Sequence, residues 1–249
     1  MNVTAIVLTL NEEENIQDCL ASVAWADHTV VLDSFSSDAT VELARQCGAE
    51  VLQNPFENFA QQHNAALEQV DAEWVLFVDA DERVTPELAE EIREVTDGYC
   101  EEVAWSIPRH NYIFGRLTRG AGWYPDYQTR LLLRGRVFWE RPVHEVVVAD
   151  GKQGHLQNPL IHYNYKDVAD FIVRQNKYNR FDARILCEAG VRPHVYTPFT
   201  QAVRQFGWRF FTLKGTQDGL HGLRLSLLMA YSEMKKYRLV RSLSRRGHI

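Results

Sequence analysis

Two aspartates, Asp79 and Asp81, stand one residue apart directly after an apolar run, Trp74–Val78. The run is short and rich in β-branched and aromatic residues, which indicates a strand buried on both faces. In open α/β sheets, ligands bind just beyond the carboxyl ends of the strands. Two carboxylates crowded at such a place repel each other unless a cation occupies the site. The pair therefore predicts a divalent-cation site, and its alternative is a solvated acidic turn.

Acidic residues also follow the two apolar segments nearest the N-terminus. Glu12 comes after the segment Val3–Leu10, and Asp33 comes after the segment Thr29–Leu32. Three predicted strand ends thus carry an acid or an acid cluster. This repetition favours a ligand site over a solvated turn at the aspartate pair.

Strand and helix patterns alternate through the first hundred residues. Apolar residues at helical spacing separate the strand-like segments, which predicts a parallel, doubly wound α/β sheet in this region. The strands are expected over 3–10, 29–32, 50–53 and 74–78, and the helices from residue 16, over 41–47, over 58–70 and over 86–95.

The pattern changes after residue 100. Val103–Pro108 and Thr129–Leu133 are predicted strands, and the stretch Asn111–Asp126 between them is rich in glycine and aromatic residues. Aromatic rings suit the apolar faces of sugars, and the alternative for this stretch is a packed loop cluster. A hairpin-like segment follows, which carries Glu140, His144 and Glu145.

The last third of the chain is helical and basic. Helical spacing is found over 167–186 and in two segments after Pro193, one of which places Phe199, Val203, Phe206 and Phe210 on one stripe. Residues 171–249 hold 15 Lys and Arg against 4 Asp and Glu, whereas residues 1–170 hold 12 against 29. A basic helix with an apolar stripe predicts contact with a membrane surface. Its alternative is a helical pair that covers the sheet or makes a dimer.

The composition is that of an ordinary globular protein, with 45% apolar and 24% charged residues. The four cysteines include no C-x-x-C pair, which argues for a reducing cytoplasm and against a disulfide framework or a structural zinc site. We find no signal peptide and no run of about 18 apolar residues, so no transmembrane helix is expected.

Three motifs together resemble the family 2 glycosyltransferases with the GT-A fold. They are Thr9-Leu10-Asn11-Glu12-Glu13, Asp33-Ser34-Phe35-Ser36-Ser37-Asp38-Ala39-Thr40 and Asp79-Ala80-Asp81. The resemblance implies an α/β fold with a Rossmann-like mixed sheet flanked by helices. We expect a catalytic domain over 1–165, with a nucleotide-binding half over 1–100 and an acceptor half over 101–165, and a helical C-terminal extension over 166–249. More narrowly, Gly122–Leu131 and Val143–Glu145 resemble bacterial lipopolysaccharide-core β-glucosyltransferases.

The resemblance also implies a UDP-sugar donor and a divalent metal, Mg²⁺ or Mn²⁺. The residues it assigns to the nucleotide sugar are Thr9, Asn11, Glu12, Asp33, Asn64, Asp79 and Ala80. In this assignment Asp33 accepts from the uracil ring, Asp81 binds the metal directly, and Asp79 addresses the ribose or a metal-bound water. His144 is the expected further metal ligand, with His162 as its alternative. The family often has Arg or Lys near His63, where this chain reads Gln61-Gln62-His63-Asn64.

Inverting transfer needs a base that takes the proton of the acceptor hydroxyl as it attacks the anomeric carbon. The family pattern favours Asp126, with Glu145 and Glu140 as the other candidates. Asp126 could instead cap a helix or pair with Arg130. The developing charge of a diphosphate leaving group also needs neutralisation, which a cation held by one or two carboxylates and phosphate oxygens supplies.

We therefore expect a metal-dependent hexosyltransferase that acts at the cytoplasmic face of the inner membrane on a membrane-associated saccharide, such as lipopolysaccharide core. One alternative is a sugar-phosphate nucleotidyltransferase, but those enzymes have a glycine-rich, basic loop where this chain has Asn11-Glu12-Glu13-Glu14. The other is a non-catalytic nucleic-acid or membrane-binding module. The charge balance of −17 over residues 1–170 would repel a nucleic-acid backbone.

Overall fold

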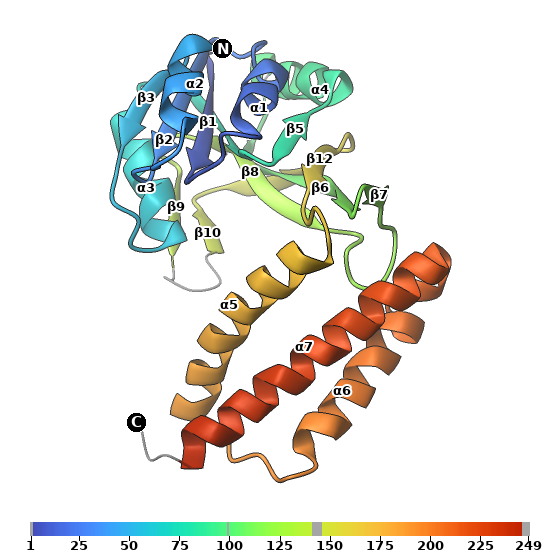
Figure 1. The fold of residues 1–249 in the computed structure, drawn as a ribbon. Coiled ribbons are helices and arrows are strands. Elements are labelled where there is room, and N and C mark those ends of the chain that lie inside the picture. The colour runs from blue at the N-terminus through green and yellow to red at the C-terminus, as the bar shows by residue number, and fades with distance from the viewer. Residues whose placement is uncertain (1, 99, 141–145, 246–249) are drawn as a thin grey trace. The chain divides into compact units, whose positions relative to one another are not determined.

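The computed structural model describes residues 2–98, 100–140 and 146–245, and the chain divides into two compact units (Figure 1). Unit 1 comprises Met1–Arg109 and Asp126–His162, and unit 2 comprises His110–Pro125 and Tyr163–Ile249. Unit 2 thus resumes at Tyr163, and the expected domain border at residue 165 stays a prediction. The stretch His110–Pro125, which we expected in the acceptor half, belongs instead to unit 2.

A mixed sheet has the strand order β3-β2-β1-β4-β8-β6-β12-β5, with β11 and β7 paired to β6 outside this path. The strands β1 to β4 are parallel, and β8 runs antiparallel to both β4 and β6. A separate antiparallel ribbon joins β9 and β10. The bounds are β1 Val3–Thr9, β2 His28–Asp33, β3 Glu50–Gln53, β4 Trp74–Asp79, β5 Glu82–Val84, β6 Glu102–Ile113, β7 Arg116–Leu117, β8 Tyr127–Leu133, β9 Val137–Glu140, β10 Val146–Ala149, β11 Lys152–His155 and β12 Leu160–Tyr163.

Helices cover both faces of the parallel strands in unit 1. Residues of α1 (Ile16–Ser22), α2 (Thr40–Gln46) and α4 (Pro86–Asp97) belong to one apolar core, and α3 (Phe59–Gln69) and β9 belong to the other (Figure 1). Side chains of β4 alternate between the two, since Leu76 and Val78 enter the first core and Val75 and Phe77 enter the second. Burial on both faces explains why β4 is a continuous apolar run.

The strand β6 continues past the predicted end at Pro108 as far as Ile113. A proline removes only one backbone donor from a strand, and Pro108 lies opposite Tyr127 in the ladder with β8. The backbone amide of the next residue, Arg109, donates to the carbonyl of Asp126 at 2.7 Å. This pairing brings the Arg109 and Asp126 side chains together.

Unit 2 contains three long helices, α5 (Val168–Glu188), α6 (Thr197–Gly207) and α7 (Leu220–Arg245). A π-helical turn, η1 (Trp208–Thr212), continues α6, and a 3₁₀ turn, η2 (Gly215–Asp218), leads into α7. The helix α7 packs against both α5 and α6. Its Gly222 is required by close approach, because a Cβ there would lie 1.8 Å from the carbonyl oxygen of Gly215.

The aromatic stretch between β6 and β8 is partly a packed cluster. The ring of Trp123 lies edge-on to Tyr165 at 5.7 Å, and the ring of Phe114 lies edge-on to Phe171 at 6.2 Å. Both rings join the core formed by α5 and α7. Tyr124, by contrast, is 47% exposed. The packed-loop alternative thus describes Phe114 and Trp123.

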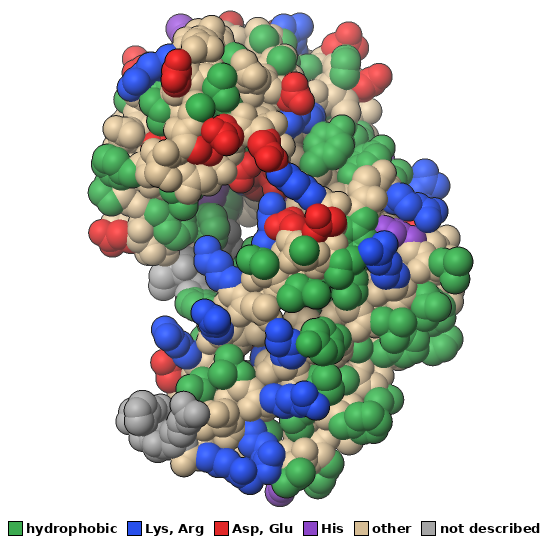
Figure 2. Space-filling model, viewed as in Figure 1, with side chains coloured by type: hydrophobic (Ala, Val, Ile, Leu, Met, Phe, Trp, Pro, Cys, Tyr) green, Lys and Arg blue, Asp and Glu red, His purple; other side chains and the backbone are tan. Residues whose placement is uncertain are grey.

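The two units differ in charge. Unit 2 holds 18 Lys and Arg against 6 Asp and Glu, a net charge of +12, whereas unit 1 holds 9 against 27, a net charge of −18. Figure 2 shows Lys and Arg side chains spread over the helices of unit 2. Among the helices of the described residues, none combines the length and the apolar character that crossing a bilayer requires.

Candidate active site

The carboxyl ends of β1, β2 and β4 bring predicted site residues to one edge of the sheet in unit 1. Thr9 in β1 pairs in register with Asp33 in β2, and Leu8 pairs with Asp79 in β4. Neighbouring strands lie about 4.8 Å apart. The side chains of Thr9, Asp33 and Asp79 therefore lie within reach of one small ligand, at the end of the sheet where open α/β folds bind ligands.

Hydrogen bonds join the loop after β1 to the loop after β2. Asn11 adopts φ 56°, a conformation that Asn tolerates, and its side-chain oxygen accepts from the Ser37 amide at 2.8 Å. The Glu12 amide donates to the hydroxyl of Thr40 at 2.8 Å. Residues of the first two motifs thus hold both loops together beside the strand ends.

Asp33 and Thr9 differ in whether their polar side-chain atoms have hydrogen-bond partners. The carboxylate of Asp33 is buried and accepts from the Ser36 amide at 2.9 Å and from Gln53 Nε2 at 3.1 Å. The buried hydroxyl of Thr9 has no hydrogen-bond partner among the described residues. Leaving a buried hydroxyl unpaired costs free energy. A ligand that bonds to Thr9 would recover that free energy.

Asp79, at the end of β4, is held from two sides. Its carboxylate forms an ion pair with Nη2 of Arg130 in β8. The same Nη2 lies 3.5 Å from Oε1 of Glu82, and Oε2 of Glu82 accepts from the Asp79 amide at 3.0 Å. Glu82 is fully buried, whereas the side chain of Asp79 is 37% exposed. Asp79 is therefore fixed in orientation and still faces solvent.

Arg109 connects Glu82 to Asp126. Its Nη1 lies 3.2 Å from Glu82 Oε1, and its Nε and Nη2 lie 2.9 Å and 2.8 Å from Asp126 Oδ2. The other oxygen of Asp126 accepts from Gln128 at 2.9 Å. The β6–β8 pairing puts Arg109 beside Asp126, and the alternative that Asp126 pairs with Arg130 stays a prediction.

Five side chains therefore form a row of alternating charge, which we call the charged chain: Asp79, Arg130, Glu82, Arg109 and Asp126. Three carboxylates and two guanidinium groups leave it with one net negative charge. Burial acts to raise the pKa of Asp79, but Arg130 and Arg109 outweigh it, so this pKa lies below its ordinary value. Burial acts to lower the pKa of Arg130, but Asp79 and Glu82 raise it. Asp79 and Arg130 are thus both charged at neutral pH.

Asp81 lies in the turn between β4 and β5, where its Oδ2 is 3.5 Å from Nε2 of His162 in β12. Their side chains are 14% and 10% exposed. Within the described ranges, no three His, Cys, Asp or Glu side chains converge closely enough to enclose a metal ion. Mg²⁺ and related cations are commonly held by one or two carboxylates while substrate phosphates and waters complete the shell. The pair Asp81 and His162 fits an open site of that kind.

Helix α3 places His63 and Asn64 beside the site. His63 stacks on Trp139 with ring centres 4.1 Å apart, and burial, reinforced by the charge of Arg130, lowers its pKa to about 4. The side-chain amide of Asn64 exchanges two hydrogen bonds of 2.9 Å with the backbone of Trp139. Both polar atoms of Asn64 thus hold β9 on α3, and its contact with the nucleotide sugar stays a prediction.

Two predicted residues, His144 and Glu145, lie outside the described residues, so their roles as metal ligand and catalytic base stay predictions. Glu140, the other candidate base, ends β9 and is exposed.

Glu82 and Arg109 were not predicted as members of the site. A signal was available for Arg109 and Arg130, because each lies within a strand segment where a buried charge needs a partner. Which carboxylate each arginine would meet depends on strand register.

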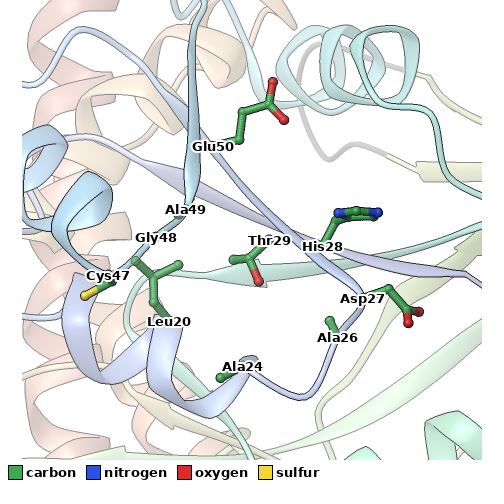
Figure 3. A pocket seen from close by; sticks show the side chains of 10 residues that line it. All are labelled: Leu20, Ala24, Ala26, Asp27, His28, Thr29, Cys47, Gly48, Ala49 and Glu50. Carbon is green, nitrogen blue, oxygen red and sulfur yellow. The ribbon is translucent and has the colours of Figure 1, made fainter.

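A hollow at the opposite end of the parallel strands contains none of the predicted site residues. It lies beside the beginnings of β2 and β3, and Figure 3 shows the side chains that line it: Leu20, Ala24, Ala26, Asp27, His28, Thr29, Cys47, Gly48, Ala49 and Glu50. Ligands of open α/β sheets bind at the carboxyl ends of the strands. The strand ends at the charged chain are therefore the candidate active site, and this hollow is not.

Residues 4–144 match the sequence model of glycosyl transferase family 2. The chain belongs to this family. It is 30% identical over 206 residues to LpsC of Rhizobium meliloti (strain 1021), a lipopolysaccharide core biosynthesis glycosyltransferase, over 78% of this chain and 74% of LpsC. It is 25% identical to an uncharacterized glycosyltransferase of Rickettsia bellii (strain RML369-C), over 97% of this chain and 87% of the relative.

A solved structure, the mannosyltransferase PcManGT from Pyrobaculum calidifontis, has a TM-score of 0.53 with this glycosyltransferase. The match covers 100% of this chain and 88% of PcManGT, at 14% identity, and shows the likeness of fold alone. The expected family, GT-A fold and enzyme class are confirmed. A nucleotidyltransferase and a non-catalytic binding module, the two alternatives, do not agree with this family.

Proposed function

We propose that this glycosyltransferase moves a hexose from a UDP-sugar to a hydroxyl group of a membrane-associated saccharide, such as lipopolysaccharide core, with inversion at the anomeric carbon. The charged chain supports this most strongly, because it holds Asp79 at one end and Asp126 at the other. The likeness to LpsC, which is named for lipopolysaccharide core biosynthesis, supports the class of acceptor. Such an acceptor places the reaction at the cytoplasmic face of the inner membrane.

The nucleoside of the donor would bind at the ends of β1 and β2. The hydroxyl of Thr9, which has no partner within the part of the chain that the structure describes, would accept or donate a hydrogen bond. Asp33 would accept from the uracil N–H with the remaining capacity of its carboxylate. Asn11 and Glu12 hold the adjoining loop in place. Asp79 and Ala80 would face the ribose and diphosphate.

A divalent cation would be held by Asp81 together with His162, with His144 as a further candidate ligand. When bound, it neutralises the charge that develops on the diphosphate leaving group. The net negative charge of the charged chain and the carboxylate of Asp81 favour a cation there. Since PcManGT was solved in complex with GDP-Man and Mn²⁺, Mn²⁺ is the first cation to test.

Asp126 would take the proton from the acceptor hydroxyl, with Glu145 and Glu140 as the other candidates. Arg109 stabilises the ionised carboxylate that a base requires, and Gln128 holds its second oxygen. Pairing with a cation also weakens a base. Glu82 offsets this, because its buried carboxylate shares the charge of Arg109.

Thermal unfolding with UDP, GDP, CDP and ADP, each with and without Mn²⁺, tests the donor and the metal together. A ligand that binds only the folded state raises the melting temperature. We expect the largest rise with UDP plus Mn²⁺, followed by slow hydrolysis of the matching UDP-hexose. If no nucleotide raises the melting temperature with or without metal, the assignment of this edge as the donor site is wrong.

A further inference from the structure

Helix α6 and the π-helical turn η1 that follows it expose apolar side chains to solvent. Five exposed residues define what we call the α6 apolar face: Tyr196, Phe199, Val203, Trp208 and Phe211, which are 63%, 69%, 57%, 48% and 65% exposed. Tyr196, Phe199 and Val203 recur at intervals of three and four residues, so they lie along one side of α6, and Trp208 and Phe211 follow in η1. Within α6 itself only Pro198 is buried.

Neighbouring rings support this face from beneath. Phe206 and Phe210 are half-buried and stack with ring centres 5.5 Å apart, and the ring of Phe211 lies edge-on to that of Phe210 at 5.1 Å. Phe211 is therefore the exposed member of an aromatic cluster with Phe206 and Phe210. Scattered single apolar residues are normal on a surface, but a contiguous apolar patch marks an interaction site.

The charge around this face identifies the kind of partner. From Ala189 to Gln217 the chain has no Asp or Glu but has four basic residues: Arg192, Arg204, Arg209 and Lys214. Figure 2 shows apolar side chains gathered along α6, with basic side chains next to them in unit 2. The net charge of +12 on unit 2 extends this bias beyond α6. An apolar partner surface with anionic groups at its border complements these features.

We propose that the α6 apolar face docks on an anionic lipid surface. Aromatic rings of Phe, Trp and Tyr would lie at the boundary between headgroups and acyl chains, as they do in interfacial helices. Arg204 and Lys214 would contact anionic headgroups, which attract basic side chains near such a surface. Docking of this face does not depend on which sugar the enzyme transfers.

Sedimentation with lipid vesicles tests the docking. The full chain should sediment with vesicles of phosphatidylcholine and phosphatidylglycerol, and much less with phosphatidylcholine alone. The double variant Phe199→Ser/Phe211→Ser should bind the anionic vesicles about tenfold more weakly or worse, because two aromatic side chains no longer enter the lipid. Arg204→Glu should weaken binding to the anionic vesicles.

A matched pair of valine variants tests whether vesicle binding depends on the α6 apolar face or on any exposed valine of unit 2. Val203→Ser changes this face, whereas Val173→Ser changes a valine that is 67% exposed on α5 of the same unit. We expect weaker vesicle binding only for Val203→Ser. Equal binding of wild type, Val203→Ser and Arg204→Glu would overturn the proposal, even if the double variant fails to fold.

A measurement of the oligomeric state tests whether this face binds a second copy of the chain and not lipid. If the wild-type chain is a dimer that Val203→Ser converts to a monomer, while neither binds vesicles, the α6 apolar face joins two copies and the lipid proposal is wrong. Hydrolysis of a UDP-hexose in solution should be unchanged by Val203→Ser. A failure of the proposed sugar transfer would therefore appear as lost hydrolysis with vesicle binding intact.

Discussion

Arg109 binds the carboxylate of Asp126 through two nitrogens, Nε and Nη2, which lie 2.9 Å and 2.8 Å from the same oxygen, Oδ2. Its third nitrogen reaches Glu82 at 3.2 Å. The orientation of Asp126 is therefore set from inside unit 1, and it is linked through Glu82 and Arg130 to that of Asp79. Two carboxylates that are 47 positions apart in the chain share one buried support.

Asp126→Asn should lower turnover about 10²- to 10⁴-fold, because the amide cannot take the proton of the acceptor hydroxyl. Binding of UDP should be retained, since the amide has nearly the same shape and the proposed donor site at Thr9 and Asp33 is unchanged. Steady-state transfer and UDP-induced melting shifts measure the two effects. A variant that turns over at nearly the wild-type rate would exclude Asp126 as the base and direct attention to Glu145 and Glu140.

Glu82→Gln should destabilise the fold by about 3–5 kcal/mol, because it removes the buried charge that lies between two guanidinium groups. Urea unfolding measures the loss. The control is Glu90→Gln on the exposed side of α4, which should change the free energy of unfolding by less than about 0.5 kcal/mol. If both variants unfold like wild type, the charged chain contributes nothing to stability and does not orient Asp79 and Asp126 as we infer.

Local sequence patterns were sufficient to predict the parallel strands of unit 1. Burial on both faces makes β4 a continuous apolar run, and β3 has the predicted bounds, Glu50–Gln53. The support of the active site was not predictable in this way. Arg130 meets Asp79 across 51 positions, and Arg109 meets Asp126 only through the β6–β8 register, which shifts at Trp105 and Ser106. Such contacts depend on long-range strand pairing, which a single sequence does not determine.

Which residues of the α6 stripe face solvent also could not be predicted from the sequence. Periodicity placed Phe199, Val203, Phe206 and Phe210 on one side of a helix, but it does not say whether that side faces a core or solvent. In the structure Phe199 and Val203 are exposed, whereas Phe206 and Phe210 are half-buried. Helix α6 packs against α7, and Phe206 and Phe210 stack on each other, and neither contact follows from periodicity.

Asp81→Asn should abolish the part of the UDP-induced melting shift that depends on Mn²⁺, because the amide is a poorer ligand for a hard cation than the carboxylate is. His162→Gln should reduce the same part of the shift. Asp71→Asn, which changes a fully exposed aspartate of unit 1, is the matched control and should leave the shift unchanged. An undiminished Mn²⁺ effect in both site variants would show that the cation binds elsewhere.

Because the fold holds His63 neutral, the protein should become less stable in mild acid. Burial lowers the pKa of His63 to about 4, against about 6.5 in the unfolded chain. Between these values the unfolded state binds a proton that the folded state does not, so stability falls as the pH drops from 6.5 to 4 and the effect is absent above 6.5. Linkage gives a loss of about 2 kcal/mol between pH 7 and pH 5 from this group.

Urea unfolding of wild type, His63→Gln and His28→Gln at both pH values isolates this contribution. His63→Gln lowers stability at pH 7, since it removes the ring that stacks on Trp139, but it should also remove about 2 kcal/mol of the pH dependence. His28 is exposed, so His28→Gln should keep the wild-type pH dependence. If His63→Gln and wild type lose the same stability between pH 7 and pH 5, then His63 is not held neutral in the folded protein. Its burial against Trp139 would then differ from the arrangement described.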